Sequence, residues 1–271
     1  MSYIYNKGSL TLSHALIADP KPSEYELHMH DFYEILCFVS GNARYIVEGH
    51  EYSLNSGCLM LMRPAELHKL MVLGKGTYER YVVTFRADDI RAMGLGDDFL
   101  KAFNDRSLGE KNKYSGNELF ELNPISVFRK MCTECATLDP RQAILANLSS
   151  LLCSLNLAFL QKDSIGLDVA ASDIGREMIA YINENLTDEI SLASVSEHVH
   201  MSPSQVNRIF RQMTGTSVYD YILSKRLIMA QELIANGEGA VAASQSCGFT
   251  DYSSFYRSYK KRIGHAPSKH I

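Results

Sequence analysis

Hydrophobic and polar residues alternate over short distances between about residue 27 and residue 86. Turn signals recur in the segment EILCFVSGNARYIVEGHEYSLNSGCLMLMRPAELH, at Ser40-Gly41-Asn42, Glu48-Gly49-His50 and Asn55-Ser56-Gly57. Short apolar runs that are divided by such turns are typical of antiparallel sheets. This part of the chain is therefore predicted to form an antiparallel β-barrel or sandwich.

A helical spacing replaces this alternation between about residues 88 and 160. After Pro140, which suits the first turn of a helix, apolar side chains recur at intervals of three and four, at Leu145, Leu148, Leu152, Leu155 and Phe159. This seam predicts either a coiled-coil-like contact in a dimer or packing of the helix on the chain's own barrel. The following segment, QKDSIGLDVAASD at 161–173, is poor in bulky apolar residues and is predicted to contain a linker.

The segment SPSQVNRIFRQMTG, residues 202–215, has the pattern of an amphipathic helix. Ser202 suits the N-cap, Pro203 suits the first turn, and the helix should end before Gly215. One stripe carries the apolar residues Val206, Ile209, Phe210 and Met213. The outward face carries Ser204, Asn207, Arg208 and Arg211. A short helix at about 192–199 and a tight turn precede this segment, so it is predicted to be the DNA-reading helix of a helix-turn-helix.

A second copy of this pattern, DYSSFYRSYKKRIG, occupies residues 251–264 without a gap in the alignment. It predicts an inward face of Tyr252, Phe255, Tyr259 and Ile263. Its outward face is predicted to offer bases and phosphates the residues Ser253, Ser254, Arg257, Lys260 and Lys261. The stretch 217–235 between the copies is long enough for a helix of about 28 Å, so two reading helices could occupy successive major grooves.

Charge distribution separates this repeat from the rest of the chain. The 271 residues carry a net charge of −4, but residues 201–271 hold nine Lys or Arg against four Asp or Glu. A basic end on an acidic body favours a polyanionic partner, here double-stranded DNA, over the alternative of an all-α protein-interaction domain with a solvated basic face. The N-terminus lacks a basic region followed by an apolar stretch, and the six cysteines are scattered, so a cytoplasmic protein with reduced thiols and no membrane contact is predicted.

Residues 173–268 resemble the two-part helix-turn-helix domain of AraC/XylS-type transcription regulators. The resemblance rests on SPSQVNRIFRQMTG, on Arg226 and Ala230 in the connector, and on CGFTDYSSFYRSYKKRIGHAP. It implies DNA contacts for the outward residues of both segments, and it makes activation through RNA polymerase and a homodimer expected. One departure is GAVAASQSCGF, where Ala240 and Ala243 replace bulky aliphatic residues and Ser244 stands where the family favours Ala. Small residues in a core predict a less firmly fixed second unit.

The segment LHMHDFYEILCF predicts a polar cluster in the N-terminal barrel. His28, His30 and Glu34 share even numbering, so their side chains should lie on one face of an extended strand, and His68 could return to the same place. Three imidazoles and a carboxylate are a plausible divalent-metal site. The spacing is similar to the cupin metal motif, and the region also resembles the cupin-type sensor domain of the same regulator family, where no metal is required.

Two functional classes follow for the barrel. A metal-dependent cupin enzyme fused to a DNA-binding domain would use an open coordination site for chemistry. A sensor would bind a small molecule through polar groups, and the candidates are His28, His30, Glu34, Arg44, Tyr45 and His68. The sensor is favoured over the enzyme because a DNA-binding domain gives ligand binding a readout. The family resemblance makes a sugar or related metabolite the expected effector.

The predicted architecture is therefore α+β. It comprises a cupin-like effector-binding barrel at residues 1–90, a helical dimerisation section at 91–165, a linker at 166–172 and a double helix-turn-helix at 173–271.

Overall fold

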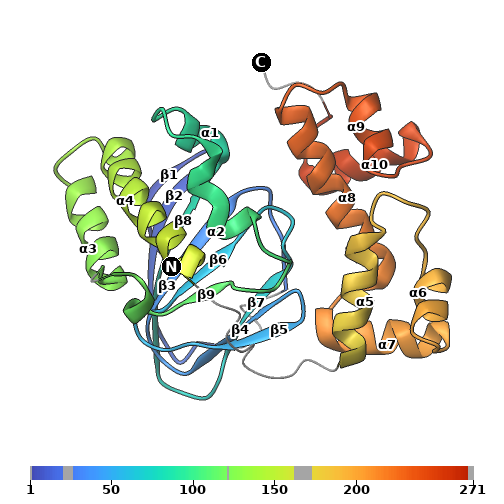
Figure 1. The fold of residues 1–271 in the computed structure, drawn as a ribbon, viewed down its shortest axis with the longest axis horizontal. Helices are drawn as coiled ribbons and strands as arrows, with labels where there is room; N and C mark the ends of the chain where they lie inside the picture. Colours follow the sequence, from blue (N-terminus) through green and yellow to red (C-terminus); the bar gives the residue numbers. More distant parts are fainter. Residues whose placement is uncertain (1, 21–26, 121, 162–172, 268–271) are drawn as a thin grey trace. The chain divides into compact units, whose positions relative to one another are not determined.

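The computed structural model describes residues 2–20, 27–120, 122–161 and 173–267, and the predicted linker at 166–172 lies outside these ranges. Two compact units contain the helices and strands: the elements β1 to α4 lie within residues 1–169, and α5 to α10 lie within residues 170–271 (Figure 1). This division confirms the α+β fold class, because the strands belong to the first unit and the second unit is helical.

The strands described in the first unit form two antiparallel sheets. A six-stranded sheet has the order β1-β2-β8-β3-β6-β9, and a three-stranded sheet has the order β5-β4-β7. The strands are β1 (Ser2–Lys7), β2 (Leu10–Ala18), β3 (Tyr33–Ser40), β4 (Ala43–Val47), β5 (His50–Ser53), β6 (Leu59–Met62), β7 (His68–Val72), β8 (Thr77–Phe85) and β9 (Lys113–Tyr114). The predicted turns hold: Glu48 and Gly49, both at positive φ, connect β4 to β5, and Gly41 at φ +122° lies between β3 and β4.

Strand β3 shows how the two faces of the large sheet differ. Its even-numbered residues Leu36 and Phe38 pack with Tyr45 of the small sheet in the core between the sheets. Its odd-numbered residues Ile35 and Cys37 belong to a second core that includes leucines of the helical layer. Because both faces of β3 are covered, the strand reads as an almost continuous apolar run.

Helices of the first unit cover the outer face of the large sheet. They are α1 (Ala87–Arg91), η2 (Asp97–Leu100), α2 (Lys101–Asn104), η3 (Gly116–Glu118), α3 (Pro124–Cys135) and α4 (Pro140–Gln161). Strand β9 lies among them in sequence and pairs with β6, although this section of the chain is predicted to be helical. The boundary predicted at residue 90 is therefore not a structural boundary, since the sheet takes a strand from the helical section.

The leucine seam of α4 is part of the core. Leu148, Leu152 and Leu155 have no exposed area, and Leu145 and Phe159 pack in the same cluster. Of the two roles predicted for the seam, packing on the chain's own sheet is the one that the structure shows. The helix is long and apolar enough to cross a membrane by length and composition, but half of its most apolar window is buried inside the protein, as in the core helix of a globular domain.

Six helices form the described part of the second unit. They are α5 (Asp173–Glu184), α6 (Leu192–His198), α7 (Pro203–Thr214), α8 (Val218–Ala235), α9 (Ala240–Ser246) and α10 (Tyr252–Ile263). Helices α6, α7, α8 and α10 lie where the sequence pattern predicts them. The pairs α6–α7 and α9–α10 are two helix-turn-helix units, and α8 connects them.

Candidate functional site

The first reading helix, α7, is fixed by its cap and by a buried apolar stripe. The Ser202 hydroxyl accepts the Gln205 N–H at 3.4 Å, and the Gln205 side chain accepts the Ser202 N–H at 3.2 Å, which satisfies two donors at the helix start. Phe210 has no exposed area and meets the Tyr221 ring edge-to-face, with ring centroids 5.4 Å apart. Gly215, at φ +72°, ends the helix in the left-handed conformation that glycine favours.

This packing leaves a polar and cationic face on α7. Ser204, Arg208 and Arg211 are exposed, as predicted for residues that meet DNA. Asn207 is half-buried, and its Oδ1 is buried without a hydrogen-bond partner among the described residues. The amide nitrogen of Asn207 is therefore the part of this side chain that remains for a base or phosphate.

The second reading helix, α10, begins with a stronger cap. The Asp251 carboxylate accepts N–H groups from Ser253 at 3.2 Å and Ser254 at 2.7 Å, and Phe255 and Tyr259 face the core. The side chains predicted to meet DNA are all exposed, namely Ser253, Ser254, Arg257, Lys260 and Lys261. The inward position predicted for Tyr252 is wrong: its side chain is 38% exposed. The helix start puts Tyr252 at the edge of the apolar stripe, where the ring covers only part of Phe255.

Arg226 of α8 joins the two helix-turn-helix units. Its guanidinium donates to the carbonyl oxygens of Leu186 at 2.8 Å, Asp188 at 2.6 Å and Gly248 at 2.8 Å. The last of these carbonyls lies in the turn that leads to α10. Burial lowers the pKa of Arg226, but arginine stays charged at any physiological pH. The connector therefore ties the loop between α5 and α6 to the turn before α10, through two and one charge-assisted hydrogen bonds respectively.

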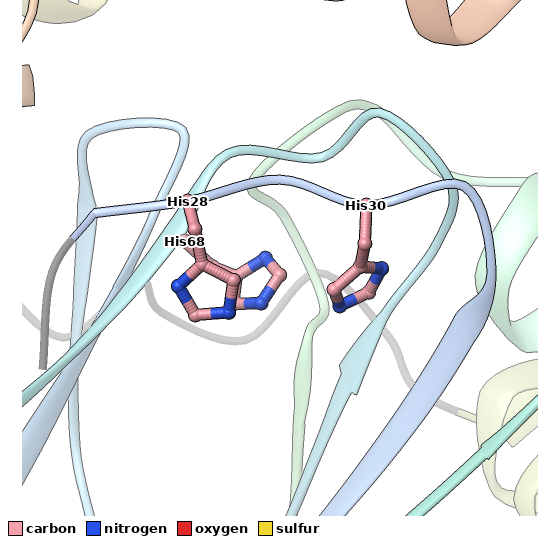
Figure 2. Close-up of side chains that lie close together, drawn as sticks. All are labelled: His28, His30 and His68. Atoms are coloured by element: carbon pink, nitrogen blue, oxygen red, sulfur yellow. The ribbon is translucent and has the colours of Figure 1, made fainter. Parts of the chain in front are cut away.

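Three histidines, His28, His30 and His68, form the histidine cluster. His28 and His30 precede β3, and their side chains extend to the same side of the segment that carries them (Figure 2). His68 is the first residue of β7, and one ring nitrogen from each histidine lies within 4.8 Å of the others. This confirms the predicted convergence of the histidines. Among the described residues the group holds no carboxylate, so Glu34 is not part of it.

Hydrogen bonds set the orientation of His68. Its Nδ1 lies 2.7 Å from the carbonyl oxygen of Glu66, which can only accept, so Nδ1 carries the proton. A neutral His68 therefore presents the lone pair of Nε2, the arrangement that metal-binding histidines share. The His68 ring is fully buried and stacks on Tyr45 with centroids 5.9 Å apart. The Tyr45 hydroxyl in turn donates to the Glu34 carboxylate at 3.3 Å.

A buried ion pair joins Glu66, in the turn before β7, to Arg106. Glu66 and Arg106 have fully buried side chains, and the guanidinium nitrogens lie 2.6 Å and 2.8 Å from the carboxylate oxygens. Asn112 and the N–H of Gly109 also donate to the carboxylate. Burial alone raises the pKa of Glu66, but Arg106, the Gly109 N–H and the charge of Arg63 outweigh burial and hold the pKa at about 2. The charged carboxylate fixes the turn that leads into β7 and His68.

Arg44 corrects the predicted effector site. It follows Ala43 and precedes Tyr45 on β4, so its side chain points to the opposite face from the buried Tyr45 ring. The exposed guanidinium forms an ion pair with Glu51 on the neighbouring strand. Of the six predicted effector residues, Glu34, Tyr45 and His68 are buried and joined by the contacts above, His30 is half-buried, and His28 and Arg44 are exposed.

Comparisons with known proteins agree with this division of the chain. Residues 13–103 match the family model described as an AraC-like ligand binding domain, and residues 195–270 match a model described as a helix-turn-helix domain. The chain belongs to the AraC family of transcription regulators. This AraC-family protein is a DNA-binding regulator, which confirms the function predicted for the repeated segments.

Relatives of the regulator cover most of its length at low identity. The HTH-type transcriptional activator RhaR of Mannheimia succiniciproducens is 21% identical over 99% of this chain and 93% of its own. The HTH-type transcriptional activator RhaS of Escherichia fergusonii is 21% identical over 89% of this chain and 85% of its own. The Arabinose operon regulatory protein of Escherichia coli is 35% identical over 35% of this chain and 33% of its own.

Two features of the regulator were missed by the sequence reasoning. Tyr256, on the exposed side of α10, is aligned with Asn207 of α7, and this register is a signal that could have found it. The second feature is a groove of about 650 Å³ in the first unit, whose parts are too far apart in sequence to be recognised. Its lining includes Asn55, Ser56, Ser115, Gly116, Asn117 and Asn123.

Proposed function

We propose that this AraC-family regulator activates transcription in the cytoplasm when a small polyhydroxylated metabolite of the sugar class binds its barrel. The observation that carries the proposal is the joining of Glu34, Tyr45 and His68 by hydrogen bonding and stacking at the inner side of the barrel. Carboxylate, phenol and imidazole groups suit the hydroxyl groups of a sugar. Two relatives are named transcriptional activators and one is named for an arabinose operon, which supports the same class of effector.

The effector is tested by thermal shift of the full chain against a panel of monosaccharides and sugar acids. We expect one compound to raise the melting temperature and to change binding to promoter DNA, which requires different affinities for two states of the protein. Glu34→Gln and Tyr45→Phe should weaken the compound's binding, whereas Arg44→Gln should not. Equal weakening by Arg44→Gln would contradict the assignment.

The groove is an alternative binding site for the effector, and a variant tests it. Asn117→Ala alters the groove and touches none of the barrel residues. If Asn117→Ala abolishes effector binding and Glu34→Gln does not, the effector binds the groove and the barrel assignment is wrong.

DNA recognition is tested at the first reading helix. Arg208 is exposed on α7, so Arg208→Ala should weaken binding to a selected operator by about 1 to 3 kcal/mol at one base position if the guanidinium meets a guanine edge. Competition binding with single-base variants of the operator measures this directly. Unchanged affinity and specificity in a folded variant would contradict the role of α7 in reading bases.

A direct contact of the bound regulator with RNA polymerase belongs to the same proposal, and transcription from a purified promoter template tests it.

A second proposal is that the histidine cluster holds a divalent metal ion. Three imidazoles converge, and Nδ1 of His68 donates to a backbone carbonyl oxygen, a hydrogen bond that metal-binding histidines commonly make. Imidazole ligands favour zinc, nickel, copper or iron over magnesium or calcium. These residues fit a bound ion that organises the barrel, and an open coordination position would also suit the alternative function of a metal-dependent enzyme.

Metal binding is tested by titrating zinc and nickel chloride into the full chain. His28→Ala and His30→Ala should each weaken binding more than about tenfold. His200→Asn is the matched control, because His200 is exposed, lies between α6 and α7 and has a positive φ that asparagine tolerates. Identical affinities in all variants would place the ion elsewhere. Mass spectrometry of candidate sugars incubated with the metal-loaded protein tests the enzyme alternative, and a new product would overturn the sensor proposal.

We also propose that the regulator is a homodimer formed by the outer face of α4. This outer face consists of Ala146, Ser150, Cys153, Leu157 and Leu160, all exposed and spaced by four, three, four and three residues. Leu157 is 53% and Leu160 is 72% exposed, and no charged residue follows Arg141 in the helix. An uncharged stripe with large apolar side chains is costly to leave in water.

The size pattern of the outer face indicates the partner. Its first half carries small side chains and its second half carries leucines, so an antiparallel copy centred near Cys153 would place leucines over small residues. A two-fold interface requires this kind of self-complementarity. The occupant is therefore a second copy of the same helix.

Light scattering of the full chain tests the dimer. The double variant Leu157→Glu, Leu160→Glu should be monomeric with a nearly unchanged melting temperature, whereas the exposed control Gln161→Glu should remain dimeric. Mild oxidation should cross-link two chains through Cys153, and Cys153→Ser should abolish the cross-link. A dimer that survives the double variant would place the contact elsewhere.

A further inference from the structure

Two tyrosines are exposed at the start of the second reading helix. Tyr252 is the first residue of α10, and Tyr256 lies one turn later. Their side chains are 38% and 37% exposed, and their ring centroids lie 6.4 Å apart with the ring planes inclined by 50°. Tyr252 also contacts the core residue Phe255, with ring centroids 5.7 Å apart. The tyrosine pair is therefore attached to the core through Tyr252 and partly exposed to solvent.

The duplicated register gives Tyr256 its place. Aligning 202–215 with 251–264 puts Tyr256 on Asn207 and Arg257 on Arg208. Asn207 belongs to the outward face of α7 that is predicted to meet DNA. Residues near the N-terminal end of a recognition helix are those that reach base edges in the major groove. Tyr256 therefore holds the position of a base reader, with a ring in place of an amide.

The chemistry of that ring differs from that of an amide. An asparagine side chain discriminates bases by hydrogen bonds, typically to adenine. A tyrosine ring offers a rigid apolar surface, and the one apolar group that a base pair displays in the major groove is the C5 methyl of thymine. The tyrosine hydroxyl can hydrogen-bond a phosphate without carrying sequence information.

We propose that Tyr252 and Tyr256 read thymine methyl groups in the part of the operator that α10 contacts. The two halves of the binding site are then recognised by different chemistry, by hydrogen bonds at α7 and by apolar contact at α10. This inference rests on the DNA-binding function and adds to it which base the second unit specifies.

The test replaces thymine by deoxyuridine, which removes only the methyl group. Duplexes that bind the full chain are first selected from a random library. Each thymine of the selected duplex is then replaced in turn. With the unaltered protein, one or two replacements in the α10 half should weaken binding about fourfold, the fold-change of one buried methyl group. Replacements in the α7 half should change binding less than twofold.

Variants assign that methyl effect to the rings. Tyr256→Ala should weaken binding to the thymine duplex and should remove the difference between thymine and deoxyuridine at one position. Tyr256→Phe should retain the difference, because the ring remains. Tyr219→Ala is the control, since Tyr219 is a 70% exposed tyrosine of α8 outside both reading helices, and its removal should change nothing.

Two failures are distinguishable in this experiment. A library that yields no preferred sequence would overturn the regulator's sequence-specific binding itself. A clear preferred sequence without a deoxyuridine effect, or with an effect that persists in both Tyr252→Ala and Tyr256→Ala, would overturn only the role of the tyrosines. Circular dichroism of each variant establishes that α10 is folded.

Discussion

The two reading helices share their frame and differ in what surrounds it. Both have twelve residues, a side-chain N-cap and a left-handed C-terminal glycine. Helix α7 buries Val206 and Phe210, and half-buries the flexible Met213 at the end of its stripe. Helix α10 buries the larger Phe255 and Tyr259 instead.

The neighbours of the two helices compensate for this difference. In the second helix-turn-helix unit, Ala243 and Cys247 are fully buried and lie in one cluster with Phe255 and Tyr259. Small residues on α9 therefore make room for large rings on α10. The alanines alone predict a less firmly fixed second helix-turn-helix unit, and this stays a prediction; total volume decides packing, so the large rings of α10 act in the opposite direction.

A second difference is electrostatic. Met213 aligns with Arg262, whose guanidinium contacts Asp220 and Ser224 near the start of α8. The first helix-turn-helix unit has a half-buried apolar side chain at this position, and the second has an arginine that forms an ion pair with the connector α8. The two copies thus keep the N-cap and the C-terminal glycine of the helix, but they differ in the side chain near its end, Met213 in one and Arg262 in the other.

The largest effect should come from removing the aromatic residue at the centre of either stripe. Phe255→Ala and Phe210→Ala should each cost about 3 to 5 kcal/mol, because a fully buried ring leaves a cavity. If the two units pack independently, footprinting should show that Phe255→Ala loses the α10 half of the operator and keeps the other half, with the reverse for Phe210→Ala. Loss of both halves in each variant would show that the units fold as one.

An intermediate effect is expected at the turn before α10. Gly248 has φ +78°, and an added Cβ would lie 2.7 Å from the Thr187 carbonyl oxygen and 3.0 Å from the Arg226 guanidinium. Gly248→Ala should therefore destabilise the second unit by about 1 to 3 kcal/mol in denaturant unfolding. Gly264→Ala is the matched control: it has a positive φ with nothing within 4 Å, so only about 1 kcal/mol of backbone strain is expected. Equal effects would mean that the Arg226 contact does not constrain this turn.

A smaller effect should separate the two caps. Ser202→Ala should cost about 1 kcal/mol. Asp251→Ala should also destabilise its helix, and its effect should depend on pH, since hydrogen bonds from Ser254 hold the pKa of Asp251 below its ordinary value. The stabilisation by Asp251 is present above that ordinary value and is lost as the pH falls below it. Thermal melts at pH 7 and pH 3 should show a gap for Asp251→Ala that narrows in acid, and a constant gap for Ser202→Ala.

The smallest effect is expected for the ion pair between Arg262 and Asp220. The Asp220 side chain is 46% exposed, so Asp220→Asn should cost less than about 1 kcal/mol. Hydrogen bonding from Ser217 and the charge of Arg262 lower the pKa of Asp220, so its contribution also disappears as the pH falls below the ordinary value. Urea unfolding in low and high salt measures it, and an effect that salt does not reduce would show that the pair is not electrostatic in origin.

Local signals made the helical unit predictable from the sequence. The cap at Ser202, the glycine at 215 and the apolar spacing between them fix the start, end and inner face of α7 within twelve residues. Tyr252 was misplaced because the same spacing does not show where a neighbouring helix stops covering a stripe. The exposure of that ring depends on α9 and the turn before α10.

The sheet unit was predictable only in part. The turns were readable, and the period of two in a strand places Glu34, Leu36 and Phe38 on one face of β3. The leucine seam could not be assigned to a partner, because a helix buried against a sheet and a helix buried in a dimer have the same spacing. Arg44 was misassigned because adjacent strand residues were placed in one site, although they face opposite ways.

The ion pair between Glu66 and Arg106 bears on how long a fragment must be to fold as a sensor domain. A fragment ending at residue 90 would keep the carboxylate in the protein interior and lose the cation, the Asn112 amide and the paired strand β9. An uncompensated interior charge of this kind costs several kcal/mol, comparable to the whole stability of a small domain. These partners require the chain through β9, and the core leucines of α4 require it through that helix, so a biosensor built from this protein should be cut after residue 161.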